Sequence, residues 1–162
     1  RWQVIEPRWI PSGSMLPTLQ IQDKILVEKL STKINLKDNL FNLKDNIVVF
    51  KPPETLIKAG YDSDIALIKR VIGIPGDKIE VKDGSLYLND EIQNKFITDK
   101  NINYSIGPVI VPENSLWVMG DNRNNSLDSH VWGPLPYKKI IGRAFLRYWP
   151  LNHFGPIYFP AV

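Results

Sequence analysis

The stretch Ile79–Leu88, with the sequence IEVKDGSLYL, gives the most direct information about the fold. Apolar and polar residues alternate in its first four positions, which is the period of a strand with one buried face. Asp83 and Gly84 follow, and a glycine accepts the positive φ that a tight hairpin turn requires. Apolar residues then return at Leu86 and Leu88. The stretch therefore predicts a β-hairpin.

Short runs rich in β-branched and aromatic residues lie on both sides of this hairpin, and runs of this kind are typical of strands. They cover Asp23–Lys29, Asn46–Phe50, Ile65–Ile74 and Ile140–Trp149. The 13 prolines disfavour long helices. A length of 162 residues suits one domain, or one domain with a small insertion. We therefore expect a mainly β fold.

Two polar stretches interrupt this pattern. Residues from about Glu91 to Gly107 are rich in asparagine and lysine, and we expect a surface excursion beyond the hairpin or a small subdomain. Lys33–Asn46 has scattered leucine and phenylalanine, and we expect a loop there.

The composition excludes some classes of site and leaves others open. Cysteine is absent, so there is no disulfide and no thiolate metal site. With only two histidines, a histidine-rich metal site is not expected. A net charge of +3 permits attraction to anionic lipid or to nucleic acid but indicates neither. No stretch approaches the roughly 18 consecutive apolar residues of a membrane-spanning helix.

Both ends of the chain carry aromatic and large apolar residues with few charges. They are Trp2, Trp9, Ile10, Trp149, Leu151, Phe154, Ile157, Tyr158 and Phe159. Such residues can lie at a lipid interface, where aromatic rings are favoured. They can equally pack over the protein's own core. The sequence leaves both possibilities open.

The first candidate for chemistry is Ile10–Leu19, with the sequence IPSGSMLPTL. Pro11 and Pro17 fix φ at two points, and Gly13 lets another backbone approach closely. The two hydroxyls of Ser12 and Ser14 could then serve as a nucleophile and a neighbouring hydrogen-bond donor. Clusters of serine, glycine and proline are also common in ordinary turns, so the segment alone does not establish catalysis.

The second candidate is Leu67–Asp77, with the sequence LIKRVIGIPGD. Alternation along a strand puts Lys69 on one face and Arg70 on the other, each beside apolar neighbours. Burial lowers the pKa of a lysine from about 10.4. A neutral amine can remove the proton of a serine near neutral pH. In the alternative, one cation reaches solvent while the other pairs with a carboxylate.

The third candidate is Met119–Pro134, a dense polar loop after an apolar run. Its side chains must satisfy their own hydrogen bonds if they are buried, and Asx turns would do this without any function. Asp128, Ser129 and His130 could suggest a Ser–His–Asp triad. Triads are normally assembled from distant segments, so we reject this interpretation.

In this order, the three segments resemble the type I signal peptidase (leader peptidase) family of Ser–Lys serine proteases. The similarity covers Pro11–Met15, the strand Asp23–Lys29, Lys69–Gly73 with Pro75–Asp77, Gly120–Arg123, Asn125-Ser126 and Asp128-Ser129. It extends from about Glu6 to Trp149.

The resemblance implies a role for each matching residue. Ser14 would be the nucleophile and Lys69 the general base. The oxyanion hole would consist of the Ser12 hydroxyl and the backbone N–H of Ser14. Ser126 would hydrogen-bond to the Lys69 amine and orient it toward Ser14.

Two further groups of residues match family positions. Those that would brace the loop behind the pair are Arg70, Asp121, Arg123 and Asp128. Those that would line shallow pockets for small substrate side chains are Ile10, Met15, Leu19 and Ile68. Bacterial members often have an acidic residue where Asn124 stands and an arginine where His130 stands. The resemblance leaves open whether His130 pairs with Asp128 as that arginine would.

The resemblance also implies an architecture and a reaction. A mostly antiparallel, barrel-like β catalytic domain would comprise residues 1–77 and 113–162, with a small β-hairpin subdomain, 78–112, inserted in it. The reaction would be hydrolysis of one peptide bond through an acyl-enzyme, without metal or organic cofactor. Substrates would be the signal peptides of exported precursors, cut after small residues in Ala-x-Ala sites.

Family members carry one or more membrane anchors just before the serine segment. Ser14 stands close to the start of this chain, so we expect the anchor to lie outside it. The resemblance places the catalytic domain on the extracytoplasmic side, in a periplasm, at a cell surface or in a thylakoid lumen, against a lipid surface. No nucleic-acid partner is expected, and the sequence makes no prediction of oligomeric state.

Two alternatives stay open at this point. A self-cleaving, repressor-type Ser–Lys protease would share the serine–lysine pair on a related β fold. A non-enzymatic basic β-barrel that binds nucleic acid would show salt-sensitive binding instead.

Overall fold

Antiparallel strands dominate the computed structural model, which describes residues 5–29, 40–93 and 101–157. The strands are β1 (Ile5–Trp9), β2 (Lys24–Lys29), β3 (Ile47–Phe50), β4 (Leu67–Gly73), β5 (Lys78–Lys82), β6 (Ser85–Leu88), β7 (Glu91–Gln93), β8 (Ile106–Ile110), β9 (Ser115–Met119), β10 (Leu135–Pro136), β11 (Ile140–Trp149) and β12 (Gly155–Pro156). The helical elements are short. They are α2 (Glu54–Lys58), α3 (Ser129–Trp132) and the 3₁₀ turns η1 (Leu40–Leu43), η2 (Arg123–Asn125), η3 (Tyr137–Lys139) and η4 (Leu151–His153). The predicted mainly β class is confirmed.

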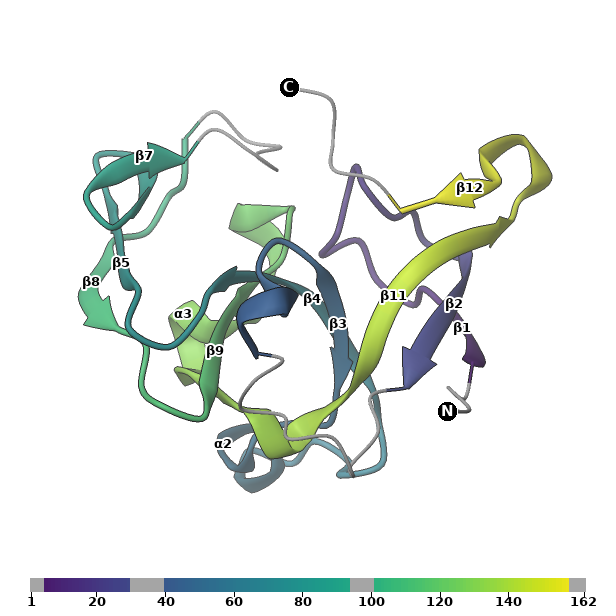
Figure 1. Ribbon diagram of the computed structural model, residues 1–162, viewed down its shortest axis with the longest axis horizontal. Coiled ribbons are helices and arrows are strands. Elements are labelled where there is room, and N and C mark those ends of the chain that lie inside the picture. The colour runs from purple at the N-terminus through teal and green to yellow at the C-terminus, as the bar shows by residue number, and fades with distance from the viewer. Residues whose placement is uncertain (1–4, 30–39, 94–100, 158–162) are drawn as a thin grey trace.

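The larger sheet has eight strands and curls strongly (Figure 1). Its order is β1-β2-β11-β3-β4-β9-β10, and β12 pairs with β11. The long strand β11 pairs with both β2 and β3, and its register shifts between Ala144 and Leu146 and again between Arg147 and Trp149. Such bulges bend a strand and increase its twist. They let one continuous strand follow the curl of the sheet.

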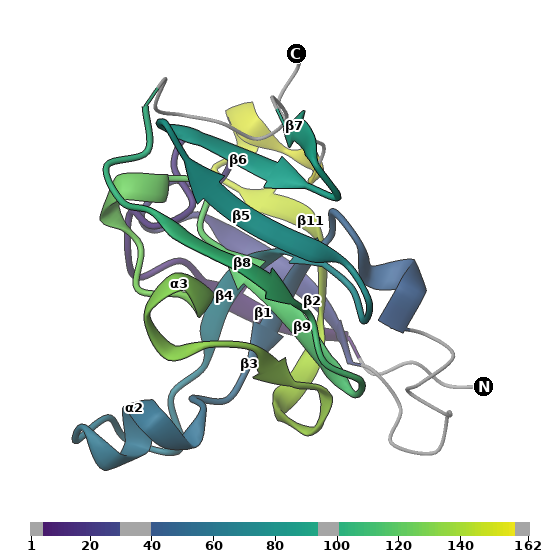
Figure 2. The same cartoon turned by 90° about the vertical axis from the view of Figure 1, so that its left-hand side faces the viewer.

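The smaller sheet has the order β7-β6-β5-β8 and lies across β9 and β4 (Figure 2). Its β5–β6 hairpin confirms the predicted one, with Lys82 paired to Ser85. The two turn residues Asp83 and Gly84 have φ values of 51° and 80°. Two positive φ values in succession are those of a type I′ turn, whose twist matches that of the flanking strands.

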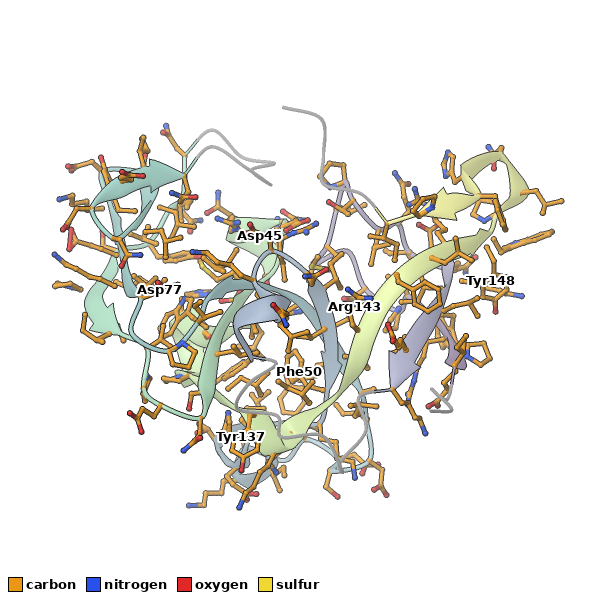
Figure 3. All side chains as sticks on the ribbon, in the orientation of Figure 1. Asp45, Phe50, Asp77, Tyr137, Arg143 and Tyr148 are labelled. Carbon is orange, nitrogen blue, oxygen red and sulfur yellow. The ribbon has the colours of Figure 1, made fainter. Side chains whose placement is uncertain are left out.

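Buried apolar residues form three clusters, and β4 contributes to all of them. Leu67 and Val71 face the first cluster, around Phe50, while Ile68 faces the second. Figure 3 shows Phe50 at the centre of the curled sheet and Tyr148 at its outer end. The third cluster joins the two sheets, because Ile72 packs with residues of β5 and β6. The two sheets therefore share a core.

Each strand predicted from residue type is present. The runs Asp23–Lys29, Asn46–Phe50, Ile65–Ile74 and Ile140–Trp149 contain β2, β3, β4 and β11, respectively. None of the helices in the described ranges is long and apolar enough to cross a bilayer.

The described parts of the two polar stretches contain more regular structure than their composition indicated. Residues 94–100 lie outside the described part of the chain. On either side of them, Glu91–Gln93 pairs with β6 and Ile106–Ile110 pairs with β5. Ile102 is 5% exposed and packs in the third cluster, so this region is not simply a polar excursion. In the expected loop Lys33–Asn46, residues up to 39 lie outside the described part, and Leu40–Leu43 form η1. Leu43 fixes that turn by packing in the first cluster.

Candidate active site

The serine segment follows β1 as a tight turn anchored in the core. The Leu16 N–H donates to the Gly13 carbonyl at 3.1 Å, and the Leu19 N–H donates to the Met15 carbonyl at 3.0 Å. Met15 and Leu19 have no exposed surface and pack in the second cluster. These two apolar anchors hold the turn so that the Ser14 side chain faces inward.

Lys69 lies in the middle of β4 and reaches the serine turn. Its Nζ donates to Ser14 Oγ at 2.8 Å, although the two residues are 55 positions apart in sequence. Ser14 is 7% exposed and Lys69 is 5% exposed. Both residues are therefore almost completely shielded from solvent.

Burial sets the protonation behaviour of this amine. It lowers the pKa of Lys69 from 10.5 to about 8, and the negative charge of Asp128 opposes part of that decrease. With such a pKa, about a tenth of the amine is neutral at pH 7. A neutral amine in hydrogen-bond contact with a hydroxyl can act as its general base.

A cleft of about 410 Å³ opens beside the pair. Ser12, Gly13 and Ser14 line it on one side. Its remaining lining residues come from α2, β4 and the loop after β9, and are Leu56, Tyr61, Leu67, Lys69, Asn122, Asn125 and Leu127. Ser12 Oγ lies 3.3 Å from Ser14 Oγ. The Ser12 hydroxyl can thus donate to an oxygen bound next to Ser14.

The loop after β9 contacts the serine turn directly. Asn122 donates its backbone N–H to the Ser14 carbonyl at 2.9 Å and its side-chain amide to the Gly13 carbonyl at 3.0 Å. A Cβ on Gly120 would lie 2.5 Å from the Ser14 carbonyl oxygen and would overlap the hydroxyl of Ser126. This close approach is possible only for a glycine.

Ser126 Oγ is buried beside this contact and makes no hydrogen bond to any residue in the described ranges. The predicted contact with the Lys69 amine is therefore not formed, although the hydroxyl lies close to the serine turn.

The predicted brace is built on a buried ion pair. Arg70 donates from Nε and Nη2 to the two carboxylate oxygens of Asp121, each at 2.9 Å, and both side chains are almost fully buried. Arg70 also donates to the Asp45 carbonyl at 2.6 Å. Thr18 donates its hydroxyl to Asp121 at 2.6 Å, so the serine turn joins the same network. No sequence motif indicates this threonine, because the contact spans 103 positions.

Asp128 organises the rest of the loop. It accepts the Gly120 N–H at 2.9 Å and, as the N-cap of α3, the His130 N–H at 3.1 Å. His130 Nδ1 contacts the same carboxylate at 2.5 Å. His130 therefore pairs with Asp128, a contact that the sequence left open. The Ser129 hydroxyl accepts the Val118 N–H at 3.0 Å and braces β9.

Arg123 lies behind the same loop. Its Nε donates to the Gly120 carbonyl at 3.0 Å, and burial lowers the pKa of its guanidinium. Gly120 is therefore held at its carbonyl by Arg123 and at its N–H by Asp128.

The four predicted pocket residues separate into two pairs. Ile10 and Ile68 line a second cavity of about 290 Å³ next to the cleft. Met15 and Leu19 line neither cavity and instead lie in the second cluster, beneath the serine turn. No group of three or more histidine, cysteine, aspartate or glutamate side chains in the described ranges could hold a metal ion.

A curled antiparallel sheet with a buried serine–lysine pair defines a class of protein, in which a lysine amine serves a hydroxyl nucleophile. Within this class, the chain belongs to the family described as "Signal peptidase, peptidase S26", which matches residues 1–149.

Named relatives agree with this assignment. The chain is 45% identical to "Probable thylakoidal processing peptidase 2, chloroplastic" of Arabidopsis thaliana, over 97% of its length and 41% of the relative's. It is 43% identical to "Probable signal peptidase I-2" of Synechocystis sp., over 94% of its length and 66% of the relative's. It is 45% identical to "Probable signal peptidase I-1" of the same organism, over 97% of its length and 78% of the relative's. The chain thus spans less than two thirds of the first two relatives.

Proposed function

We propose that this chain is the catalytic part of a signal peptidase I, a serine endopeptidase that removes signal peptides from exported precursor proteins. The observation that carries the proposal is the 2.8 Å hydrogen bond between two nearly dry groups, Lys69 Nζ and Ser14 Oγ. Membership of the signal peptidase family supports the substrate class. Neither a self-cleaving protease nor a nucleic-acid-binding barrel is favoured by the relatives.

In the first half of the reaction, neutral Lys69 takes the proton of Ser14 while Ser14 Oγ attacks the carbonyl carbon of the scissile bond. The Ser12 hydroxyl and the Ser14 N–H stabilise the resulting oxyanion, and one such donor is typically worth about 3 kcal/mol. The protonated Lys69 then gives its proton to the leaving amine, which breaks the peptide bond. An acyl-enzyme ester on Ser14 remains.

In the second half, Lys69 removes a proton from water, which attacks the ester. Collapse of the new tetrahedral intermediate releases the acid and returns the proton to Ser14. We assign Ser126 the role of orienting the Lys69 amine. Its hydroxyl is buried beside the turn that carries Ser14.

The substrate would lie between two free strand edges. The second cavity separates the end of β1 from residues 64–68 at the start of β4. Among the described strands, β1 pairs only with β2, and β4 pairs with β9 only from Arg70 onward. An extended peptide can therefore hydrogen-bond to these edges. Ile10, Ala66 and Ile68 are among the residues that line the cavity, and their apolar side chains suit the alanine side chains of an Ala-x-Ala site.

A lipid surface is the second proposed partner. Trp9 and Trp149 are the cross-strand partners of the same residue, Lys24, so the three side chains form a row on one face of the sheet. Both tryptophans are largely exposed, as are Leu151 and Phe154. These residues lie around the β1, β2 and β11 end of the molecule (Figure 1). Of the other terminal aromatics, Trp2, Tyr158 and Phe159 lie outside the described residues.

This face supports a membrane-associated domain. The family and its thylakoidal and bacterial relatives support a position on the extracytoplasmic side. We also propose that residues 78–112 form an insertion in a catalytic domain of residues 1–77 and 113–162. The four-stranded sheet from Lys78 to Ile110 supports these boundaries, and the shared third cluster means that the insertion packs on the domain.

Cleavage of a precursor with an Ala-x-Ala site tests the function. Ser14→Ala and Lys69→Met should each reduce kcat by at least about 10³-fold, because the two groups act as one unit. The exposed lysine variant Lys138→Met should cleave like the wild type. Full activity of Lys69→Met, with normal circular dichroism, would remove Lys69 from the mechanism.

Incubation without substrate separates the proposal from self-cleavage. The wild-type mass should stay unchanged, whereas a self-cleaving protease would produce fragments that Ser14→Ala does not.

A further inference from the structure

Residues 101–104, which we call the bridging segment, run from the smaller sheet to the loop behind the serine–lysine pair. On the side of the sheet, the Ile102 N–H donates to the Gly84 carbonyl at 3.0 Å, at the turn of the β5–β6 hairpin. The Ile102 side chain is buried in the cluster that joins the two sheets. Asn101 packs against the same turn, since a Cβ on Gly84 would lie 2.9 Å from its Oδ1. The segment is therefore anchored at one end.

On the side of the loop, Asn124 binds the backbone of the bridging segment through both ends of its amide. Its Oδ1 accepts the Asn103 N–H at 2.8 Å, and its Nδ2 donates to the Asn101 carbonyl at 2.9 Å. An amide can donate and accept in this way, whereas a carboxylate can only accept. Asn124 lies in η2, two positions before Ser126.

The far end of the same loop meets the bridging segment through an aromatic contact. The rings of Tyr104 and His130 are stacked, with centroids 3.8 Å apart and planes 8° apart. His130 in turn contacts Asp128 through its ring and its backbone N–H. Asp128 holds the N–H of Gly120, which touches Ser14 and Ser126. The segment thus holds the loop on both sides of Ser126.

We propose that the bridging segment positions the catalytic loop, with Asn124 and Tyr104 as the positioning residues. The inference rests on the proposed peptidase function. Residues 101–104 line neither of the two cavities, so they act through the loop and not on the substrate. Their role is to keep Ser126 and Asp128 in register with Lys69 and to keep water away from the amine.

The charges near Lys69 decide how loosening of the loop would appear in an experiment. Dehydration is the larger influence on the pKa of the amine, and the carboxylate of Asp128 is the smaller one. On the other face of β4, Arg70 is paired with Asp121. Water entering behind a loosened loop should therefore raise the pKa of Lys69 toward its ordinary value.

Matched variants separate the two contacts from general destabilisation. Tyr104→Phe should keep kcat, because it keeps the ring, and the hydroxyl that it removes is buried without a partner among the described residues. Tyr104→Leu removes the stacked ring, and Asn124→Ala removes both amide hydrogen bonds to the bridging segment without adding a charge. Each should reduce kcat about tenfold with little change in KM, because displaced catalytic groups affect the chemical step more than binding. The substrate for these measurements of kcat and KM is the Ala-x-Ala precursor.

A second measurement does not depend on peptidase activity. The pH dependence of Lys69 acetylation by acetic anhydride, followed by mass spectrometry on the full chain, reports the titration of its amine. The midpoint should lie at higher pH in Tyr104→Leu and Asn124→Ala than in the wild type and Tyr104→Phe. If the wild type cleaves no precursor but these midpoints differ, the peptidase function fails and the positioning role stands.

Two results would overturn the inference. One is an unchanged kcat together with unchanged Lys69 titration in both Tyr104→Leu and Asn124→Ala. The other is a fall in kcat that accompanies a fall in Tm while the Lys69 midpoint stays constant, since that pattern indicates loss of folded protein only.

Discussion

Lys69 is a residue whose burial costs stability and enables chemistry. Removing an ammonium group from water is unfavourable, and the amine responds by losing its proton more easily. The only hydrogen bond that it makes among the described residues is the one to Ser14. The residue that makes the site reactive is therefore expected to make the fold less stable.

The rate of precursor cleavage should rise with pH through about 8, because only the neutral amine can accept the serine proton. The measurement is kcat/KM between pH 6 and 10 with the Ala-x-Ala precursor. A rate that rises only near pH 10 would show that the amine is not dehydrated in the working enzyme.

The same pKa predicts a pH-dependent stability. Between pH 8 and about 10.4, the unfolded chain binds a proton at Lys69 that the folded chain does not, so the free energy of unfolding should rise with pH in this window. Below pH 8, the cost to the fold is present in full, at about 3 kcal/mol. Lys69→Met should therefore be more stable than the wild type at pH 7, by about 1–3 kcal/mol after the lost hydrogen bond is considered.

Urea unfolding at pH 7 and pH 10 measures this effect. Lys138→Met, which changes an exposed lysine, is the control and should leave both values unchanged. A Lys69→Met protein that is less stable than the wild type at pH 7 would contradict the prediction.

At the scale of elements, the turn of the β5–β6 hairpin contacts the bridging segment, which in turn contacts the loop behind the active site. Its turn needs positive φ at both Asp83 and Gly84, and the Gly84 carbonyl holds Ile102 of the bridging segment. The conformation of the hairpin turn therefore helps to hold the bridging segment in place.

Gly84→Val should lower the free energy of unfolding by about 1–3 kcal/mol, because a β-branched residue is strained at φ 80°. Its Cβ would also lie 2.9 Å from Asn101 Oδ1. Asp83→Asn, at the neighbouring position, should change stability by less than about 0.5 kcal/mol, because asparagine tolerates the left-handed region. Urea unfolding of the two variants is the measurement, and equal stabilities would count against the turn assignment.

At the scale of the whole molecule, two exposed regions lie at opposite ends of the long axis (Figure 1). One contains Trp9 and Trp149 around Lys24, and the Lys24 ammonium lies 5.7 Å from the Trp149 ring centroid. The other contains Ile92 and Ile110, which are exposed on the outer strands of the smaller sheet. The first region combines two tryptophan rings with a cation, which is a composition typical of a lipid interface. The smaller sheet has one such contact, between Lys82 and the partly buried Tyr87.

The double variant Trp9→Ser/Trp149→Ser should bind vesicles of mixed neutral and anionic lipid at least about tenfold more weakly, since it removes two large interfacial side chains. Ile92→Ser/Ile110→Ser is the matched control and should bind like the wild type. Vesicle co-sedimentation measures the binding. Equal binding by the two double variants would place the lipid-facing surface elsewhere.

Much of the fold could be predicted locally. Alternation along residues 79–88 identified the hairpin, and the turn chemistry of Asp83 and Gly84 fixed its register. The composition of Glu91–Gly107 concealed β7 and the start of β8. Glu91–Gln93 is too short to show alternation, and Gly107 and Pro108, which are uncommon inside strands, interrupt the apolar residues of Ile106–Ile110. Within the site, Ser14 and Lys69 were identified because the segments that carry them resemble those of a family. Only the fold shows that the two side chains are hydrogen-bonded and buried.

By itself, the sequence determined β2, β3, β4, β11 and the β5–β6 hairpin, because side-chain alternation and turn preferences are local properties. Its short motifs indicated Ser14 and Lys69 through the resemblance to a family. The tertiary structure alone decided which residues surround that pair. Thr18 meets Asp121 across 103 positions, and Asn124 meets Asn103 across 21. Contacts of this kind depend on the order of strands in a curled sheet, and no local pattern specifies that order.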